Sequence, residues 1–243
     1  MQQLGNSRSV HRNDHLLQTP DTFVRAPLPG MRNATAVVHV APARGAGFTQ
    51  YTAQFETGGM LGPATGQRFV YVLEGELEVN GCVLGIGGYA YMPSGFEADV
   101  TSREAARATV IEKLYQPLAA EPAPAFFIGR ESQVEPKPFL GDEGLLVRTL
   151  LPDAPAFDCA VNTMTFQPGV TLPMVEIHVM EHGLLMLQGS GIYRLSDFWY
   201  PVTAGDFIWM APYCPQWFGA LGKIAAKYLI YKDWNRHPLG QAR

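Results

Sequence analysis

Four side chains that could bind one metal ion lie close together in the second half of the chain. Glu176 and His178 are two residues apart, His182 follows, and Gln216 lies further along. Because side chains alternate between the two faces of a β-strand, Glu176 and His178 would share one face. The alternate positions are β-branched, which favours strand over helix: Val175, Ile177 and Val179. The pattern predicts a metal pocket, with Gln216 delivered by a later strand lying alongside.

The chemistry of these four side chains narrows the choice of metal. Burying Glu176 without a counter-charge is costly, so a cation in the pocket is the natural partner. Two imidazoles, one carboxylate and one amide carbonyl contain no thiolate, and they suit Mn²⁺, Fe²⁺ or, less well, Zn²⁺. Such a set leaves about two octahedral positions for substrate or water. The residue types alone do not choose among the three metals.

The segment from His178 to His182 also spells H-x-x-E-H, the motif of the inverted zinc peptidases. That motif must lie on a helix to present both histidines together. Gly169, Pro173 and Gly183 leave too short a window for a helix, and the β-branched alternation disfavours one. We therefore expect no peptidase site here.

Composition excludes several classes of protein. The 243 residues suffice for one large or two small domains, each with its own core. With 47% hydrophobic and 16% charged residues, and with 25 glycines and 19 prolines, the chain is typical of a compact all-β protein with many turns. The net charge of −4 gives no basic surface, so we expect no nucleic-acid partner. We expect no membrane association either, because no apolar run approaches the roughly 18 residues of a membrane span.

The first fourteen residues are polar and lack the apolar segment of a secretory signal. We interpret them as a tail or as an arm packing on a neighbouring subunit, with His11 and His15 in solvent. We expect a homo-oligomer. The cysteines Cys82, Cys159 and Cys214 are odd in number and far apart, which predicts reduced thiols in a cytoplasmic protein.

The two halves of the chain repeat one another. Three segments recur in order, 55–58 with 166–169, 72–75 with 187–189, and 87–92 with 205–210. A duplicated β-barrel is the simplest architecture. We predict a flexible arm over residues 1–20, an N-terminal barrel over 21–115, a proline-rich connector over 116–138 and a C-terminal barrel over 139–243.

The repeat also predicts that only one barrel holds metal ligands. When Gly75 is aligned with Gly189, the residues opposite Glu176, His178 and His182 are Gly62, Ala64 and Arg68. None of these three can replace its counterpart as a ligand.

A family resemblance follows from two motifs. The first is Gly169-x6-Glu176-x-His178-x3-His182-x6-Gly189, and the second is Gly205-x6-Pro212-x3-Gln216; together they resemble the two motifs of the cupin barrel. Cupins usually carry histidine, glutamate and histidine at the positions of Glu176, His182 and Gln216. The permuted set found here resembles the metal-binding half of the (S)-ureidoglycine aminohydrolases, bicupin enzymes of allantoin breakdown. The resemblance is dense in the C-terminal half and looser in the N-terminal half.

The resemblance implies a fold, a reaction and a set of site residues. The fold would be a bicupin, two tandem cupin barrels of the jelly-roll type. The enzyme would be a hydrolase that uses one Mn²⁺ per chain and releases ammonia from (S)-ureidoglycine to give (S)-ureidoglycolate in purine catabolism. The metal ligands would be Glu176, His178, His182 and Gln216. Glu176 and Lys232 would be catalytic, and the substrate contacts would be Glu176, Gln216, Tyr193, Tyr228 and Lys232.

Two other classes of function stay open at this stage. One is a different metallocupin enzyme, such as a dioxygenase or a sugar isomerase. The other is a non-catalytic cupin that binds a small molecule. Dioxygenase chemistry needs Fe²⁺ and oxygen, so activity with Mn²⁺ under anaerobic conditions would separate it from hydrolysis.

Overall fold

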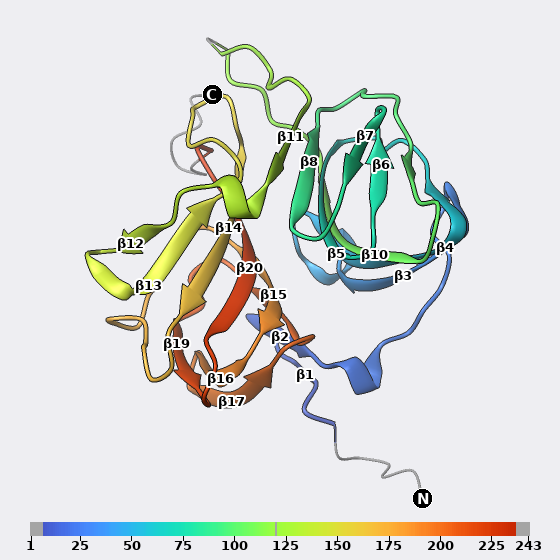
Figure 1. Cartoon of the computed structure of the whole chain (residues 1–243). Helices are drawn as coiled ribbons and strands as arrows, with labels where there is room; N and C mark the ends of the chain where they lie inside the picture. The colour runs from blue at the N-terminus through green and yellow to red at the C-terminus, as the bar shows by residue number, and fades with distance from the viewer. Residues whose placement is uncertain (1–6, 120, 237–243) are drawn as a thin grey trace, which may run out of the picture. The chain divides into compact units, whose positions relative to one another are not determined.

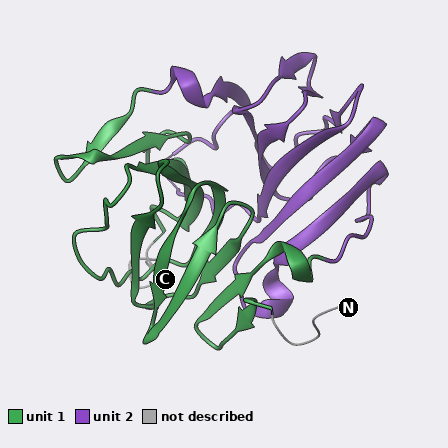
Figure 2. Ribbon diagram, turned by 60° about the horizontal axis from the view of Figure 1, so that its bottom comes forward, with its two compact units in different colours: residues 1–23, 135–243 green, residues 24–134 purple. Residues whose placement is uncertain are grey.

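The computed structural model describes residues 7–119 and 121–236. Within these residues the regular structure consists of twenty β-strands and three short 3-10 helices, so the predicted all-β class is confirmed. No helix in this part of the chain is long and apolar enough to cross a membrane. The chain forms two compact units, unit 1 from residues 1–23 and 135–243 and unit 2 from residues 24–134 (Figure 2).

Unit 1 contains two antiparallel sheets (Figure 1). The larger sheet orders its strands as β1 (Val10–His11), β2 (His15–Gln18), β18 (Phe207–Met210), β15 (His182–Gln188), β20 (Ala226–Asp233), β14 (Cys159–Phe166), β13 (Asp142–Thr149) and β12 (Lys137–Phe139). The smaller sheet has the order β17 (Phe198–Thr203), β16 (Ser190–Leu195) and β19 (Gln216–Leu221).

The core of unit 1 lies on the inward faces of these strands. Along β16, buried residues alternate with half-buried ones, as expected for a strand with one face on a core. Aromatic rings fill much of the interior. Phe166 and Phe218 pack edge to face with ring centroids 4.9 Å apart, and Tyr228 lies 5.6 Å from Phe218. This packing fixes the strands that carry the pocket residues.

Unit 2 is a nine-stranded sheet. Its path is β11 (Phe127–Arg130), β8 (Gly88–Met92), β5 (Gln67–Glu74), β10 (Ala106–Lys113), β4 (Thr49–Leu61), β9 (Val100–Thr101), β6 (Leu77–Val79) and β7 (Cys82–Leu84), and β3 (Met31–Val40) pairs with β4. The 3-10 helices are η1 (Pro20–Thr22) in unit 1 and η2 (Pro42–Arg44) and η3 (Glu131–Gln133) in unit 2.

The two units repeat one arrangement of strands. The order β8-β5-β10-β4-β3 in unit 2 matches β18-β15-β20-β14-β13 in unit 1. Gly75 and Gly189 end the equivalent strands β5 and β15, both with φ of 71°. A Cβ would lie 2.6 Å from the carbonyl oxygen of Ala105 at Gly75 and of Ala225 at Gly189. Both the left-handed backbone and the close contact require glycine, which explains why this pair stands out in the sequence.

The structure departs from the sequence-based expectations near the N-terminus. From Val10 the chain forms β1 and β2, and β2 pairs with β18 of the same chain. His15, expected in solvent, is wholly buried, so that prediction is wrong. The cause is the apolar pair beside it, because Leu17 joins the core of unit 1. Residues 1–6 of the expected arm lie outside the described residues.

The segment expected to be a connector also contains regular structure. β11 pairs with β8, and Phe127 stacks on Tyr91 with ring centroids 5.6 Å apart. β11 therefore forms despite the prolines around it, because Phe127 packs against Tyr91.

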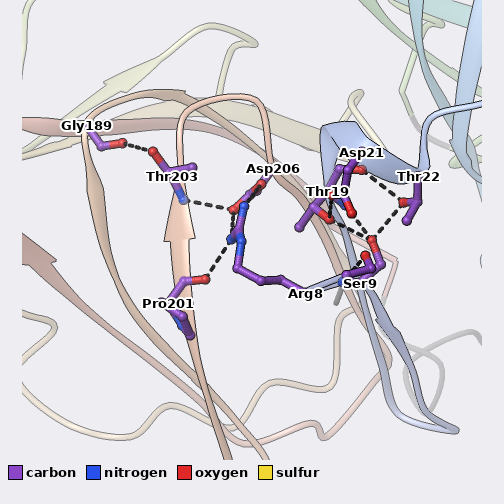
Figure 3. A network of polar contacts seen from close by, with 10 residues as sticks. Arg8, Ser9, Thr19, Asp21, Thr22, Gly189, Pro201, Thr203 and Asp206 are labelled. Atoms are coloured by element: carbon purple, nitrogen blue, oxygen red, sulfur yellow. Dashed lines mark hydrogen bonds and ion pairs between the residues drawn. The ribbon is translucent and has the colours of Figure 1, made fainter. Parts of the chain in front are cut away.

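A polar network fixes the start of the described chain to unit 1 (Figure 3). The Arg8 guanidinium donates to both carboxylate oxygens of Asp206, at 2.6 and 2.9 Å, and to the carbonyl of Pro201 at 2.9 Å. Asp206 is fully buried and also accepts the backbone N–H of Thr203. The pairing is bidentate, the geometry in which an arginine–carboxylate bond is strongest.

We expect Arg8→Met to lower the free energy of unfolding by about 1–3 kcal/mol, because it leaves the buried Asp206 carboxylate short of donors. Urea unfolding of the variant and the wild type measures the difference. Lys223→Met, a change at an exposed residue of the same unit, serves as the control. Equal stability of the two variants would contradict the structural role of Arg8.

His39 is a core histidine of unit 2, as its place in an apolar strand predicts. Its side chain is 4% exposed, and Nε2 forms a 2.8 Å hydrogen bond with Thr52 Oγ1. Burial lowers the pKa of His39 to about 3. Between about pH 6.5 and pH 3, His39 is therefore protonated in the unfolded state and neutral in the folded state.

The stability contributed by a neutral His39 should be lost as the pH falls from about 6.5 toward 3. We expect His39→Gln to flatten the pH dependence of the unfolding free energy across this range by up to about one proton, or about 1.4 kcal/mol per pH unit. Denaturant unfolding at several pH values between 7 and 4.5 measures both slopes. Parallel curves for variant and wild type would show that His39 does not titrate differently in the two states.

Candidate functional site

A cavity of about 300 Å³ opens within unit 1. All seven residues predicted from the sequence line it: Glu176, His178, His182, Tyr193, Gln216, Tyr228 and Lys232. They come from a loop, from β15, β16 and β19, and from β20. The fold therefore brings together side chains that are up to 56 positions apart in sequence, from 176 to 232.

Glu176 and His178 lie on a loop rather than on the predicted strand. Two isolated bridges, Thr171–Gly219 and Glu176–Gln216, join the loop to β19. In the second, the Glu176 N–H donates to the Gln216 carbonyl at 2.8 Å and the Gln216 N–H donates back at 2.9 Å. Pro173 lies between the two bridges and has no backbone N–H to donate, so the bridges do not join into a ladder. The shared face is nevertheless preserved: Glu176 Oε2 lies 3.2 Å from His178 Nε2, while Ile177 points outward and is 61% exposed.

His182 begins β15, where it pairs with Met210 of β18 and with Lys232 of β20. Its Nδ1 lies 3.1 Å from the carbonyl oxygen of Met180. A carbonyl only accepts, so Nδ1 carries the proton and Nε2 keeps the lone pair that a metal would use. Burial, with help from the charges of His178 and Lys232, lowers the pKa of His182 to about 3. Its imidazole is therefore neutral, the form that binds metals.

Gln216 and two tyrosines form the inner wall of the cavity. The Tyr193 hydroxyl donates to Gln216 Oε1 at 3.3 Å, and the Tyr228 hydroxyl donates to the Met164 sulfur at 3.4 Å. Burial raises the pKa of both phenols, and the nearby Glu176 carboxylate adds to the effect. Both tyrosines therefore remain protonated hydrogen-bond donors at neutral pH.

Lys232 supplies a positive charge to the cavity. It lies on β20 directly across from His182 on β15, and its Nζ is 4.0 Å from the centre of the Trp234 ring. Burial lowers the pKa of Lys232, and the charges of Asp153 and Glu176 partly oppose this. Because a protonated amine has no lone pair, Lys232 suits an anionic ligand group rather than a metal.

The peptidase alternative does not fit this arrangement. His178 and His182 are not on a helix. Glu181 is 5% exposed and accepts the Trp209 indole N–H at 2.9 Å. Its carboxylate is held by a structural hydrogen bond and does not line the cavity.

Another group of potential metal ligands lies outside the cavity. Among the described residues, the group of His, Cys, Asp or Glu donor atoms that all fall within 4.8 Å of one another is Asp14, His15 and Cys214. Hydrogen bonds explain this cluster: His15 Nδ1 lies 2.8 Å from Asp14 Oδ1, His15 Nε2 lies 2.9 Å from the Tyr200 hydroxyl, and Asp14 also accepts from Ser196. The cluster joins the N-terminal segment to β17 and to the turn between β16 and β17.

The proposed metal ligands in the cavity do not form so compact a cluster. The donor atoms of Glu176, His178 and His182 do not all fall within that 4.8 Å distance. With Gln216 they nevertheless offer one carboxylate, two imidazoles and one amide oxygen around one space, without a thiolate. This donor chemistry fits Mn²⁺ or Fe²⁺.

Comparison with known proteins decides the family. No family model matches the chain. The (S)-ureidoglycine aminohydrolase of Arabidopsis thaliana is 40% identical over 244 residues, which cover 97% of this chain and 80% of that protein. The (S)-ureidoglycine aminohydrolase of Escherichia coli K12 is 30% identical, with 96% and 93% covered. The chain belongs to the (S)-ureidoglycine aminohydrolase family.

Solved structures agree with this family assignment. The Escherichia coli protein Ylba superposes with a TM-score of 0.84 at 28% identity, covering 95% of this chain and 96% of that one. A putative glyoxylate-induced protein of Pseudomonas aeruginosa gives 0.87 at 31% identity, with 96% and 93% covered. Bacillus subtilis oxalate decarboxylase, at 13% identity, gives 0.70 over 95% of this chain and 80% of that one, which shows a shared fold. The predicted all-β, barrel-like cupin fold is confirmed at this level.

The cavity of this aminohydrolase-family chain also contains residues that the sequence analysis missed. The remaining lining residues are Lys137, Pro138, Phe139, Leu140, Val147, Thr149, Asn162, Met164, Leu172 and Ile230. Asn162 is one of three polar residues on β14, with Thr163 and Thr165. Its residue type alone gives no signal, and only the strand register shows that this position faces the cavity.

Proposed function

We propose that this chain is an (S)-ureidoglycine aminohydrolase, which releases ammonia from (S)-ureidoglycine and yields (S)-ureidoglycolate in purine breakdown. The observation that carries the proposal is the permuted set Glu176, His178, His182 and Gln216, which lines one cavity together with Lys232. The family relationship supports it, because the Arabidopsis relative of that name matches 97% of this chain.

The proposal includes a bicupin architecture in which both units are cupin barrels. The repeated strand order and the equivalent glycines Gly75 and Gly189 support a duplication. We propose one metal ion per chain, bound in unit 1.

In unit 2, Arg68 occupies the position equivalent to His182 in unit 1. Arg68 pairs with Met92 of β8 and Glu112 of β10, as His182 pairs with strands β18 and β20. Its guanidinium forms a 2.7 Å ion pair with Glu112 and donates to the Gly62 carbonyl at 2.7 Å. A fixed positive charge thus occupies the place of a metal ligand, and arginine cannot be a ligand because it does not deprotonate.

In unit 1 the metal would be held by the Glu176 carboxylate, the His178 and His182 imidazoles and the Gln216 amide oxygen. Mn²⁺ is our choice, from the donor set and the family resemblance. When bound, the ion would supply Lewis-acid polarisation and a fixed point for orienting the substrate.

The other cavity residues act on the substrate directly. Its reacting carbon bears an amine and a ureido nitrogen beside a carboxylate, so the bond to the amine breaks readily. Lys232 pairs with the carboxylate, and the Tyr193 and Tyr228 side chains contact the substrate from the cavity wall. In the overall reaction the water oxygen bonds to this carbon, and the amine leaves as ammonia with a proton from that water. Glu176 is the group that accepts and returns this proton.

We further propose that the enzyme works as a homo-oligomer in the cytoplasm. Its three cysteines are free, and Cys159 and Cys214 are buried, as suits a reducing compartment. Sedimentation equilibrium under reducing conditions would test the oligomeric state, and a monomer would overturn that part of the proposal.

Ammonia release from freshly generated (S)-ureidoglycine tests the function. The chain is stripped with a chelator, and Mn²⁺, Fe²⁺ or Zn²⁺ is returned under anaerobic conditions. We expect the fastest release with Mn²⁺ and no need for oxygen. A rate no higher than that of the buffer would overturn the proposal. If the anaerobic assays are inactive and activity appears only when air is admitted to the Fe²⁺ sample, the chain is a dioxygenase instead.

A further inference from the structure

One polar atom in the cavity lacks a hydrogen-bond partner. In the described part of the chain, the buried side-chain atoms without one are Gln50 Oε1, Arg107 Nε and Asn162 Oδ1. Of these three residues, Asn162 lines the cavity of unit 1. A buried amide oxygen without a partner is unfavourable, so an acceptor in this position fits a donor supplied by a ligand.

The strand register places Asn162 close to the proposed substrate anchor. On β14, Asn162 pairs with Ile230 of β20, and Lys232 is two residues further along that strand. The three residues line the same cavity. Diagonal neighbours of this kind on adjacent antiparallel strands are about 7–8 Å apart at Cα. One small molecule can therefore contact both side chains at once.

The other carboxylate and amide oxygens of the cavity are not free to accept hydrogen bonds from a ureido group. Lys137 and Lys232 are donors only, and Tyr193 and Tyr228 already donate to Gln216 and Met164. The oxygens of Glu176 and Gln216 belong to the proposed metal set. A ureido group has several N–H donors. A neutral amide oxygen is a better acceptor for them than a second carboxylate, because that carboxylate would lie beside the negative carboxylate of the substrate. Among the side-chain carboxylate and amide oxygens of the lining residues, that of Asn162 is the one that remains.

We propose that Asn162 determines specificity for the ureido group: its carboxamide oxygen accepts a ureido N–H while Lys232 holds the carboxylate at the other end of the substrate. The inference rests on the proposed function of the same cavity. It assigns recognition of the ureido end to β14, a strand that contributes none of the metal ligands.

Two stable analogues test this role by binding, without turnover. Hydantoate carries a carboxylate and a complete ureido group, whereas N-acetylglycinate replaces the terminal amino group with a methyl. Calorimetry on the Mn²⁺-loaded wild-type chain should show hydantoate binding about tenfold more tightly, the usual effect of one well-formed hydrogen bond. Asn162→Leu keeps the side-chain size but removes the acceptor, and it should abolish this preference by weakening hydantoate binding alone.

Controls separate recognition from folding. Ile230→Val changes an apolar residue of the same cavity and should leave the preference intact. If Asn162→Leu does not fold, Asn162→Ala decides, with the same loss of preference expected. With (S)-ureidoglycine, the variant should raise KM about tenfold with a smaller change in kcat.

The outcomes distinguish this inference from the proposed function. If the wild type shows no preference between the analogues, or if the folded variants keep it, the role of Asn162 is wrong even when ureidoglycine is hydrolysed. If the wild type prefers hydantoate and the Asn162 variant does not, but the wild type releases no ammonia from ureidoglycine, then Asn162 recognises the ureido group and the assigned reaction is wrong.

Discussion

Replacing His178 with alanine should remove both the bound metal and the ammonia-releasing activity. His178 lies on a loop joined to β19 by two isolated bridges, and its Nε2 is 3.2 Å from Glu176 Oε2. The other histidine among the lining residues is His182, which is itself a proposed ligand, so no imidazole of the lining can replace that of His178. We expect activity to fall by at least about a thousandfold, equivalent to about 4 kcal/mol of transition-state stabilisation.

The metal content and the rate are measured on the same preparation of His178→Ala. His39→Gln is the matched control, because it removes a buried histidine from unit 2 and should leave both quantities unchanged. A His178→Ala chain with wild-type metal content would show that His178 is not a ligand.

Replacing Lys232 with methionine should leave the metal bound and reduce turnover about thirty- to a thousandfold. A charged hydrogen bond that also positions the reacting carbon contributes about 2–4 kcal/mol, which corresponds to this range. Methionine keeps most of the side-chain volume, and β20 keeps its backbone pairing with β14 and β15. The fold should therefore survive the change.

The paired control is Lys227→Met, which removes a lysine from the same strand but from outside the cavity lining. It should retain wild-type turnover. Near-normal hydrolysis by Lys232→Met would mean that Lys232 does not anchor the substrate, and loss of metal in that variant would mean that it acts on the metal site instead.

The sequence carried enough information to find the candidate ligands and their neighbours. The reason is local: the spacing of Glu176 and His178 places both on one side of an extended segment, whether or not that segment is a regular strand. The repeat was also readable, since Gly75 and Gly189 occupy positions that only glycine tolerates. Tyr228 and Lys232 share a face by the period of two.

What could not be predicted depends on contacts between distant parts of the chain. His15 looks solvent-exposed in a polar segment, and its burial follows from the packing of Leu17 in the core and from the pairing of β2 with β18, where His15 lies opposite Met210. The strand predicted through Glu176 does not form, because the segment pairs with β19 only at two isolated bridges on either side of Pro173. Asn162 resembles any polar residue in a strand until the register with Ile230 places it in the cavity.

We propose that one metal ion, held by Glu176, His178, His182 and Gln216 in unit 1, is the cofactor of this hydrolase. The most direct test is the number of Mn²⁺ ions bound per chain, measured by elemental analysis on active wild-type protein and on a His178→Ala, His182→Ala double variant. Because the four proposed ligands line a single cavity, we expect about one ion per wild-type chain and none in the double variant. Full activity without metal, a second ion per chain, or an ion retained by the double variant would contradict it.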